Sequence, residues 1–205
     1  MDWQLDPAEV RVLGALLEKE ISTPEYYPLS LNALVNACNQ KSNRDPVVAY
    51  DDDTVEDALE RLRLQGLASR ITGRDSRVPK HEQRFIEKFN LGRREAAILC
   101  VLMLRGWQTP GELRGRSERL HTFDGLDEVE SILGRLTEME FVKKLPRQTG
   151  FKEQRWAHLL SGDVVVGEEE AVRETAAPAG TRVDQLAADL AALRREFEEF
   201  KKKFE

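Results

Sequence analysis

Apolar residues recur three and four positions apart near the start of the chain, with polar residues between them. Val10, Leu13, Leu16 and Leu17 follow this spacing, which places them on one face of a helix. Pro7 precedes them, and proline suits the first turn of a helix because the amide groups there lack helical partners in any case. The pattern therefore predicts an amphipathic helix that begins at Pro7.

The helical pattern stops and then starts again after this segment. Thr23-Pro24 joins a capping residue to a first-turn proline, a pair that starts a new helical turn. The periodic spacing resumes at Ser30, with apolar positions at Leu31, Leu34 and Val35. We therefore expect a second helix that starts at Ser30 and turns these three residues inward.

The third helical pattern is the clearest of the series. Asp53 followed by Glu56 matches a capping box, in which two side chains satisfy free amide groups at the start of a helix. The apolar stripe behind it consists of Val55, Ala58, Leu59 and Leu62. Gly66 ends the pattern, and a strand-like run follows over residues 67–71. A helix followed by a short strand is the expected structure.

The same series of patterns returns later in the chain in shortened form. The sequence pattern of residues 9–85 is repeated over residues 95–156 in three blocks, which are shifted along the chain by 86, 74 and 71 positions. In the middle block, for example, Leu59 falls on Leu133. Because three blocks match in the same order, the chain is interpreted as two copies of one small unit.

The second copy carries its own helix signals. Thr109 and Glu112 match a capping box for a short second helix that ends near Gly115, and Asp127 is expected to cap the third helix. A strand-like run follows over 141–145. The apolar positions are Ala96, Leu99, Leu102 and Met103 in the first helix and Val129, Ile132, Leu133 and Leu136 in the third.

Three helices followed by a two-stranded hairpin form the pattern of a winged helix, a variant of the helix-turn-helix. The fold class expected is mainly α with small β-hairpins. We expect one winged-helix domain over residues 1–90 and a second over 91–166. Each repeat carries its own apolar set, so each is expected to fold alone.

A long block in the first copy resembles a known family. It runs from Thr23-Pro24-Glu25-Tyr26-Tyr27 through Leu34 and continues from Cys38-Asn39-Gln40 to Pro46. Over residues 2–162 the chain is similar to the bacterial YceH-like family of uncharacterised proteins. The resemblance implies two tandem winged-helix domains, and it implies neither an activity nor functional residues.

The composition changes after the second copy. Residues 167–182 contain acidic, Ala, Pro and Gly positions and are expected to form a flexible linker. Residues 183–205 then carry an alternating 3-4 stripe of Val183, Leu186, Leu190, Leu193, Phe197, Phe200 and Phe204. Such a stripe is typical either of a coiled coil, which would make a homodimer, or of an amphipathic helix folded back on the body.

The bulk properties indicate a soluble cytoplasmic protein. The 205 residues have a net charge of −6, of which residues 1–90 contribute −4, residues 91–166 contribute +1 and residues 167–205 contribute −3. No apolar run reaches the length of a membrane helix, and the first residues lack a signal peptide. Cys38 and Cys100 stand singly in helical patterns and are expected in the core.

Sequence motifs for catalysis or metal binding are missing. His81, His121 and His158 are scattered, without the spacing of metal ligands. The run 51–53 lacks the spaced oxygens of a calcium loop and is better interpreted as a helix cap. There is neither a glycine-rich phosphate loop nor a nucleophile motif. We therefore expect a protein without enzymatic activity or cofactor.

Basic residues gather in the expected hairpins and in the loop between the second and third helices. The candidate nucleic-acid-binding residues are Arg70, Arg74, Arg77, Lys80 and Arg84 in the first hairpin, Lys143, Lys144, Arg147, Lys152 and Arg155 in the second, and Lys41 and Arg44 in the loop. The clusters in the hairpins either contact phosphates or only solubilise the hairpin, and the loop segment Asn43-Arg44-Asp45-Pro46 either contacts a partner or simply makes a turn. The start of each third helix is acidic, which argues against reading of bases in the major groove.

Two functions remain open on the sequence. One is a DNA-associated regulator of transcription that grips DNA through its basic wings, an expectation that rests on the fold. The other is an adaptor that binds a protein partner through its winged-helix domains, which the acidic third helices favour. Neither reading involves a membrane.

Overall fold

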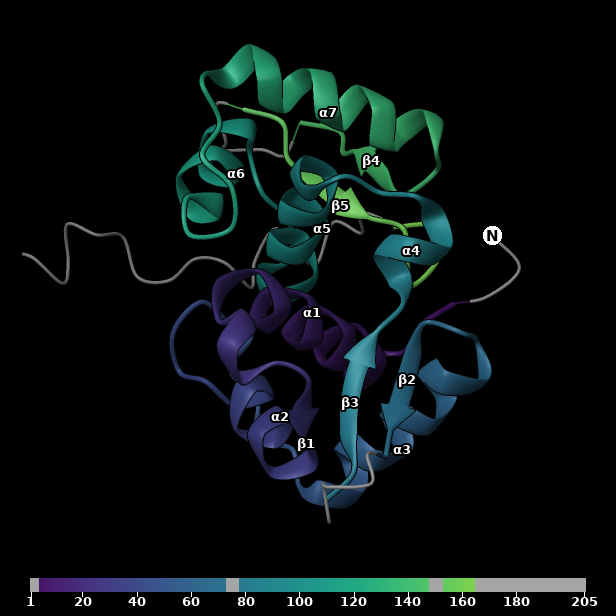
Figure 1. The fold of residues 1–205 in the computed structure, drawn as a ribbon. Helices are drawn as coiled ribbons and strands as arrows, with labels where there is room; N and C mark the ends of the chain where they lie inside the picture. The colour runs from purple at the N-terminus through teal and green to yellow at the C-terminus, as the bar shows by residue number, and fades with distance from the viewer. Residues whose placement is uncertain (1–3, 73–77, 148–152, 165–205) are drawn as a thin grey trace, which may run out of the picture. The chain divides into compact units, whose positions relative to one another are not determined.

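The computed structural model describes residues 4–72, 78–147 and 153–164 of the chain (Figure 1). The described residues belong to one compact unit, which ends at Val164. The expected linker at 167–182 and the expected helix at 183–205 lie outside the described residues. Within the described part the fold is mainly helical, with two small antiparallel sheets.

The first helix, α1, spans Pro7–Ser22, which confirms its expected start. Asp6 caps it: the Glu9 amide donates to the Asp6 carboxylate at 2.8 Å, and the Asp6 amide donates to the Glu9 carboxylate at 2.8 Å. This reciprocal capping box satisfies two amide groups at the helix start. The apolar positions of α1 are buried, so the expected inward face is confirmed.

A short helical turn, η1 (Pro24–Tyr26), and a two-residue strand, β1 (Leu29–Ser30), lead into helix α2 (Leu31–Cys38). The Ser30 hydroxyl accepts a hydrogen bond from the Ala33 amide at 3.3 Å, so Ser30 caps the helix as expected. Leu34 is buried, whereas the neighbouring apolar positions 31 and 35 are only partly covered.

Helix α3 spans Asp52–Leu64 and is capped by Asp51 rather than by Asp53. The Asp51 carboxylate accepts a hydrogen bond from the Thr54 amide at 2.9 Å. The prediction of Asp53 as the cap was therefore wrong by two residues, because each member of the run 51–53 is a suitable capping residue and the sequence does not rank them. The four residues of the predicted apolar stripe are buried.

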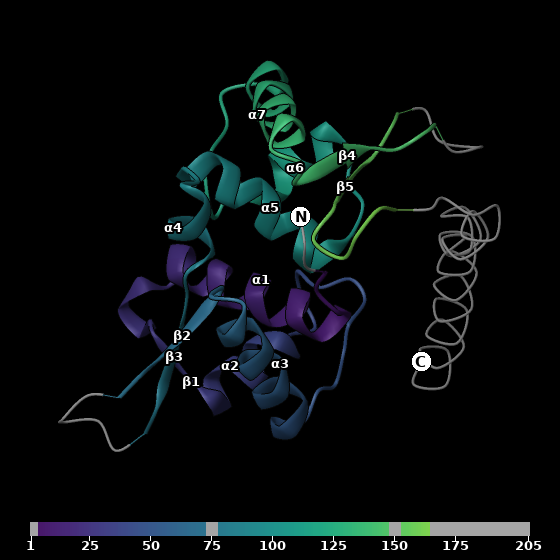
Figure 2. The ribbon, with the colours of Figure 1, turned by 90° about the vertical axis from the view of Figure 1, so that its right-hand side faces the viewer.

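The first sheet has the strand order β1-β3-β2. Strands β2 (Ala68–Ile71) and β3 (Lys80–Gln83) form an antiparallel hairpin, and β1 pairs with the other edge of β3. Figure 2 shows this hairpin extending away from the helices of the first repeat. The strand-like run predicted at 67–71 is confirmed to within one residue.

The second repeat follows a connecting helix, α4 (Phe85–Phe89), which the sequence patterns did not predict. It contains α5 (Arg93–Arg105), α6 (Pro110–Ser117), α7 (Leu126–Glu138), β4 (Val142–Lys144) and β5 (Trp156–His158). Strands β4 and β5 form the second sheet.

Two of the helix boundaries predicted for the second repeat need correction. The capping box of Thr109 and Glu112 is present, but α6 continues to Ser117, past the predicted end near Gly115. Helix α7 starts after Gly125 with no side-chain cap, so Asp127 lies inside the first turn instead of capping it. There its carboxylate still lies near the positive end of the helix dipole. The apolar stripe of α7 is buried as predicted.

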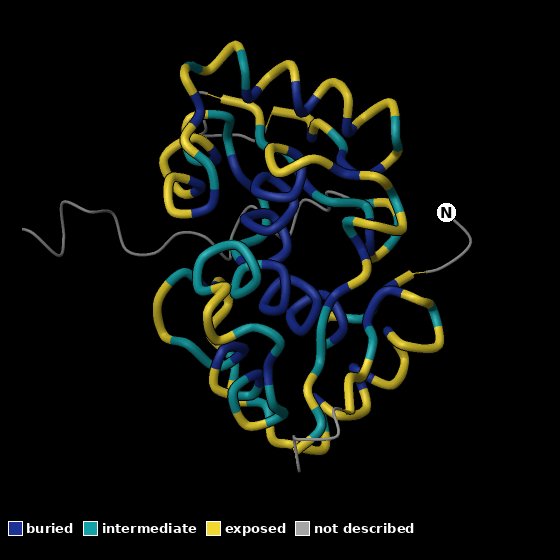
Figure 3. Tube along the Cα trace, viewed as in Figure 1, coloured by how far each residue is buried: buried dark blue, intermediate teal, exposed yellow. Residues whose placement is uncertain are grey.

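The two repeats share one core. Helix α1 packs along α5, and residues 96–104 of α5 are all buried (Figures 1 and 3). The chain comes close enough at Gly14 that a side-chain carbon there would lie 3.0 Å from a Leu104 methyl group and 3.1 Å from the Met103 Cβ atom. Independent folding of each repeat stays a prediction, and the shared core argues against it.

Aromatic rings and a backbone contact also join the repeats. The rings of Phe85, Phe89 and Phe141 meet edge to face, with centroid distances of 5.1–5.5 Å. The Leu5 amide donates to the Leu160 carbonyl at 2.8 Å. The first residues of the described chain therefore lie against the end of the second repeat.

Candidate nucleic-acid interface

The first hairpin carries cations on both of its faces. Arg70 pairs with His81 across the strands, and Lys80 pairs with Ile71, so the two cations point to opposite sides. Both are exposed. Arg84 follows β3 and is paired with Glu82 at 3.2 Å and with Glu87 at 2.7 Å. The other two candidates, Arg74 and Arg77, lie outside the described residues.

The second hairpin repeats this arrangement. Lys143 and Lys144 are neighbours on β4, so they also point to opposite faces. The Lys143 ammonium lies 2.7 Å from the Asp163 carboxylate, and the Lys144 ammonium lies 5.8 Å from the centre of the Trp156 ring. Lys152 lies outside the described residues.

Arg147 and Arg155 stand on the outer segments of this hairpin. The Leu145 amide donates to the Arg155 carbonyl at 2.8 Å, so the two segments stay paired beyond β4 and β5. Arg147 is exposed and Arg155 is partly covered. The hairpin therefore places four described cations along one short ladder.

The third helices present acidic surfaces. On α3, the exposed positions near the start include Asp52, Asp53, Glu56 and Asp57. The arginine at 61 is 2.8 Å from the Asp6 carboxylate, and the one at 63 is 2.6 Å from Glu60. Because carboxylates repel phosphates and the nearby cations are paired, the α3 surface is a poor match for the major groove of DNA.

Helix α7 has the same character. Asp127 and Glu130 are exposed near its start, and Glu128 lies 3.1 Å from Arg94. Further along, Arg135 is bound to Glu95 at 2.7 Å. In both repeats, then, the hairpin carries exposed cations and the start of the third helix carries exposed carboxylates.

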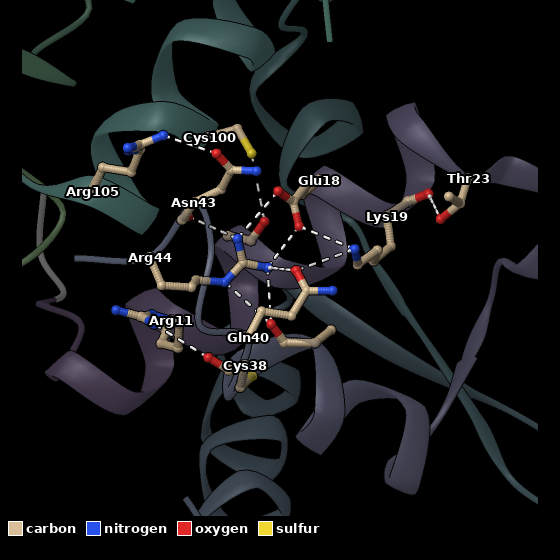
Figure 4. A network of polar contacts seen from close by, with 12 residues as sticks. Arg11, Glu18, Lys19, Thr23, Cys38, Gln40, Asn43, Arg44, Cys100 and Arg105 are labelled. Carbon is tan, nitrogen blue, oxygen red and sulfur yellow. Dashed lines mark hydrogen bonds and ion pairs between the residues drawn. The ribbon is translucent and has the colours of Figure 1, made fainter. Parts of the chain in front are cut away.

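Arg44 is buried, and its contacts give it a role inside the fold (Figure 4). Its guanidinium makes two hydrogen bonds to the Glu18 carboxylate, at 2.6 and 3.1 Å, and two to the Ala37 carbonyl, at 2.8 and 3.1 Å. It also donates to the Gln40 side chain at 3.1 Å. The prediction that Arg44 contacts nucleic acid was therefore wrong, because its side chain is buried and bonded inside the fold. Lys41, three residues earlier, is exposed and remains a candidate.

The same network holds the long connection between α2 and α3 in place. Arg11 of α1 donates to the Cys38 carbonyl at 3.2 Å and to the Pro46 carbonyl at 2.7 Å. The Asn39 side chain exchanges hydrogen bonds of 2.7 and 2.8 Å with the backbone of Tyr50. Burial raises the pKa of Glu18, but the hydrogen bond and the charge of Arg44 outweigh it, so the net shift is downward.

A cavity of about 160 Å³ lies beside this network, where the repeats meet. Its lining includes four cations that the sequence patterns did not single out: Lys19, Arg105, Arg116 and Arg119. They come from α1, α5, α6 and the turn after α6, so only their meeting in space marks them as a group. No spacing rule along the chain would have found them.

Burial disfavours chemistry at His81, at His158 and at both cysteines. Burial lowers the pKa of His158 to about 4, and burial together with Arg70 lowers that of His81. Burial raises the pKa of Cys38 to about 12 and also raises that of Cys100, and both thiols are in the core as predicted. Among the residues that the structure describes, no three His, Cys, Asp or Glu side chains are grouped to hold a metal ion.

The described helices are all too short or too polar to cross a membrane.

Several known bacterial proteins are similar to this chain in sequence. It is 67% identical to a UPF0502 protein of Solibacter usitatus, over the full length of both chains. It is 54% identical to one from Opitutus terrae, over 93% of this chain and 83% of that one, and 58% identical to one from Koribacter versatilis, over 76% and 73%. The family model "Protein of unknown function, DUF480" matches residues 5–151. The chain therefore belongs to the DUF480 family of uncharacterised proteins, of which these UPF0502 proteins are relatives.

Proposed function

We propose that the two repeats are tandem winged-helix domains and that the protein binds DNA through its two basic hairpins, without catalysing a reaction. The first repeat supports the winged-helix assignment, because a helix, a short strand, two helices and a hairpin follow one another, and the short strand joins the hairpin sheet.

The second repeat matches this topology in one further detail. Gln108 exchanges backbone hydrogen bonds with Trp156 of β5, at 3.0 and 2.7 Å. This bridge stands immediately before α6, just as β1 stands immediately before α2 and pairs with β3. Both repeats therefore attach the segment before their second helix to the second strand of the hairpin.

The DNA proposal rests on the separation of charge between hairpin and third helix. Cations on both faces of a hairpin suit a strand pair that lies across a groove or along a phosphate backbone. The acidic starts of α3 and α7 would be repelled there. Binding in this mode draws its affinity from phosphates and carries little sequence preference.

The ion pairs on the hairpins do not block this role. The Lys143 side chain is 42% exposed and that of its partner Asp163 is 72% exposed. An ion pair of this kind in water adds little to stability. A phosphate of DNA could therefore replace the carboxylate at small cost.

Fluorescence anisotropy with two labelled duplexes of unrelated sequence tests the proposal. The wild-type chain should bind both duplexes, and log K should fall steeply with log salt concentration. Two double variants, Arg70→Ala/Lys80→Ala and Lys143→Ala/Lys144→Ala, should weaken binding to both duplexes alike. Each lost phosphate contact should reduce the salt slope by about 1.

The matched control is Arg63→Ala/Lys88→Ala, which removes the same charge from outside the hairpins. It should leave the affinity close to that of the wild type. Absence of measurable wild-type binding at low salt would rule out the DNA function. Loss on one duplex only would show that the hairpin reads bases.

A second function, a protein-binding adaptor, is favoured by one observation in the second repeat. An open groove of about 390 Å³ runs between the starts of α6 and α7 and the second hairpin. Its lining includes Pro110, Leu126 and Trp156, and Leu126 is 46% exposed. Apolar side chains in an open groove suit an apolar segment of a partner. Pull-down from lysate with and without nuclease distinguishes the two functions, because a partner bridged by DNA is lost after digestion.

A cytoplasmic location belongs to the same proposal, since DNA and its regulators meet there in bacteria.

A further inference from the structure

The cavity between the repeats has a strongly cationic lining. It is bordered by the end of α1, the loop after α2, the end of α5 and the end of α6. Lys19, Arg105, Arg116 and Arg119 contribute four positive charges. The lining contains one carboxylate, that of Glu18.

The Glu18 carboxylate is already neutralised by other groups. Arg44 binds it through two hydrogen bonds, and the Lys19 ammonium lies 3.4 Å from it (Figure 4). Among the described residues, Arg105 and Arg119 therefore have no carboxylate partner, whereas Arg116 is paired with Glu112. A cluster of this sign is unexpected from the composition, because the whole chain carries a net charge of −6.

Arg105 shows an unmet bonding capacity at this site. Its Nη1 atom donates to the Asn43 side chain at 2.9 Å, but its Nε atom is buried without a hydrogen-bond partner in the described structure. Burial lowers the pKa of Arg105, and the charge of Arg116 lowers it further. A buried donor without an acceptor is unfavourable, and a turn of the guanidinium toward the cavity would let an anion accept its hydrogen bond.

The other two arginines differ in how they are held. Arg116 is paired with Glu112 at 3.1 Å and also donates to the Gln108 side chain. Arg119 is exposed and has no side-chain partner among the described residues. Arg116 is thus held by two partners, and the Arg119 guanidinium has its hydrogen-bond donors available for a ligand.

We propose that this cavity binds a small phosphate-bearing anion, either inorganic phosphate or a short phosphomonoester. Arginine forks match phosphate oxygens in geometry and charge. The volume of about 160 Å³ suits such a ligand, since a cavity of about 150 Å³ is known to hold benzene. Val101, Leu104 and Leu120 in the lining would contact the carbon part of a monoester.

This proposal goes beyond DNA binding, because the cavity stands apart from both hairpins. Its lining comes from the junction of the repeats and includes none of the hairpin cations. A ligand seated there would contact residues of both repeats at once. It would therefore stabilise their packing against each other.

Thermal denaturation and calorimetric titration of the full chain with inorganic phosphate test the site, with chloride at matched ionic strength as reference. The wild-type protein should show saturable binding and a rise in melting temperature with phosphate. Arg119→Gln and Arg105→Gln should each weaken phosphate binding by at least about tenfold, as expected for the loss of a charge-assisted hydrogen bond. Arg119 is exposed, so its variant should fold even if the Arg105 variant does not.

Arg114→Gln is the matched control, because Arg114 is an exposed arginine on α6, five residues before Arg119, and is not part of the lining. It should bind phosphate as the wild type does. Equal losses in the Arg114 and Arg119 variants would overturn the proposal, as would the absence of saturable binding beyond that of chloride.

Duplex DNA is the other source of phosphate oxygens. A competition experiment, in which DNA is added to the phosphate-bound protein, distinguishes DNA from a free anion as the ligand of the cavity. DNA should leave phosphate binding unchanged, and Arg119→Gln should bind DNA with wild-type affinity. Displacement of phosphate by DNA together with loss of DNA binding in Arg119→Gln would assign the cavity to the DNA backbone and would overturn the small-anion proposal.

Discussion

The guanidinium of Arg44 and the carboxylate of Glu18 lie in bidentate contact, at 2.6 and 3.1 Å, and join the loop after α2 to the end of α1. The Arg44 side chain is fully covered and that of Glu18 is 13% exposed. Removing one partner of such a covered ion pair leaves the other charge buried without compensation, and this is strongly destabilising.

Replacing Arg44 with Ala should therefore destabilise the fold strongly. The variant leaves the Glu18 carboxylate covered and without its main partner, and we expect a loss of about 3 kcal/mol in the free energy of unfolding. Urea denaturation measures this change. Arg63→Ala, which removes an arginine from an exposed pair with Glu60, is the control and should cause a much smaller change. Equal effects of the two variants would contradict the structural role of Arg44.

The pair of Arg44 and Glu18 should also make the free energy of unfolding depend on pH in the acidic range. The pKa of Glu18 in the fold lies below its ordinary value of 4.5, so the folded state holds the proton less tightly than the unfolded state. The contribution is fully present above that ordinary value and is lost as the pH falls through the lower folded value. Urea denaturation over an acid pH series should show the loss in the wild type and a reduced loss in Glu18→Gln. Identical pH profiles would show that another carboxylate is responsible.

Gly14 should tolerate no larger side chain, because α1 and α5 approach closely there. Gly14→Val should destabilise the protein by more than about 2 kcal/mol, since the added carbons meet Leu104 and Met103. The control is Gly134→Ala on α7, where a side-chain carbon meets no atom within 4 Å. That variant should stabilise by about 0.5–1 kcal/mol through helix propensity. Thermal and urea denaturation of both variants check the contrast.

Leu59 and Leu133 occupy equivalent buried positions on α3 and α7. Replacing either with Ala should lower the free energy of unfolding by about 2–5 kcal/mol. Because the repeats share one core, the two single variants should each broaden or shift the same unfolding transition. A change below about 1 kcal/mol at both sites would contradict the assignment of this core.

The stripe of apolar residues at 183–205 should be covered by another surface, and self-association is the expected outcome. Light scattering on the full chain should give a dimer, and the chain that ends at Val166 should give a monomer. If both are monomers at tens of micromolar, the coiled-coil interpretation is wrong. The helix would then belong to the body of the protein or to another partner.

Periodicity along the chain predicts the longer helices of both repeats and most of their buried positions. Val55 and Val129, for example, were assigned to the core by spacing alone, because a helix must bury its apolar side. Helix starts were predicted well where one capping residue stood alone, as at Ser30, and less well where three aspartates competed. Helix α4 is a single short turn, and a segment of that length carries no period to detect.

The sites were harder to predict than the fold. The sequence places Arg44 in a loop, where it could contact a ligand or form part of a turn, and only the three-dimensional position of Glu18 shows that it is buried. The cations around the junction cavity belong to elements separated by up to a hundred residues in the sequence, so no local pattern connects Lys19 with Arg119. Tertiary packing creates both the buried Arg44 pair and the cationic cavity, and the periodicity of the sequence does not show which residues that packing brings together.

The hydrogen bond from the Leu5 amide to the Leu160 carbonyl means that the fold can be completed only after the second repeat has been synthesised. During synthesis, the segment before α1 emerges from the ribosome first, yet its partner is among the last residues of the second repeat. The side of α1 that packs on α5 likewise stays uncovered until α5 has been synthesised. The first repeat therefore passes through a period on the ribosome with part of its apolar surface uncovered, when a chaperone would bind it most readily.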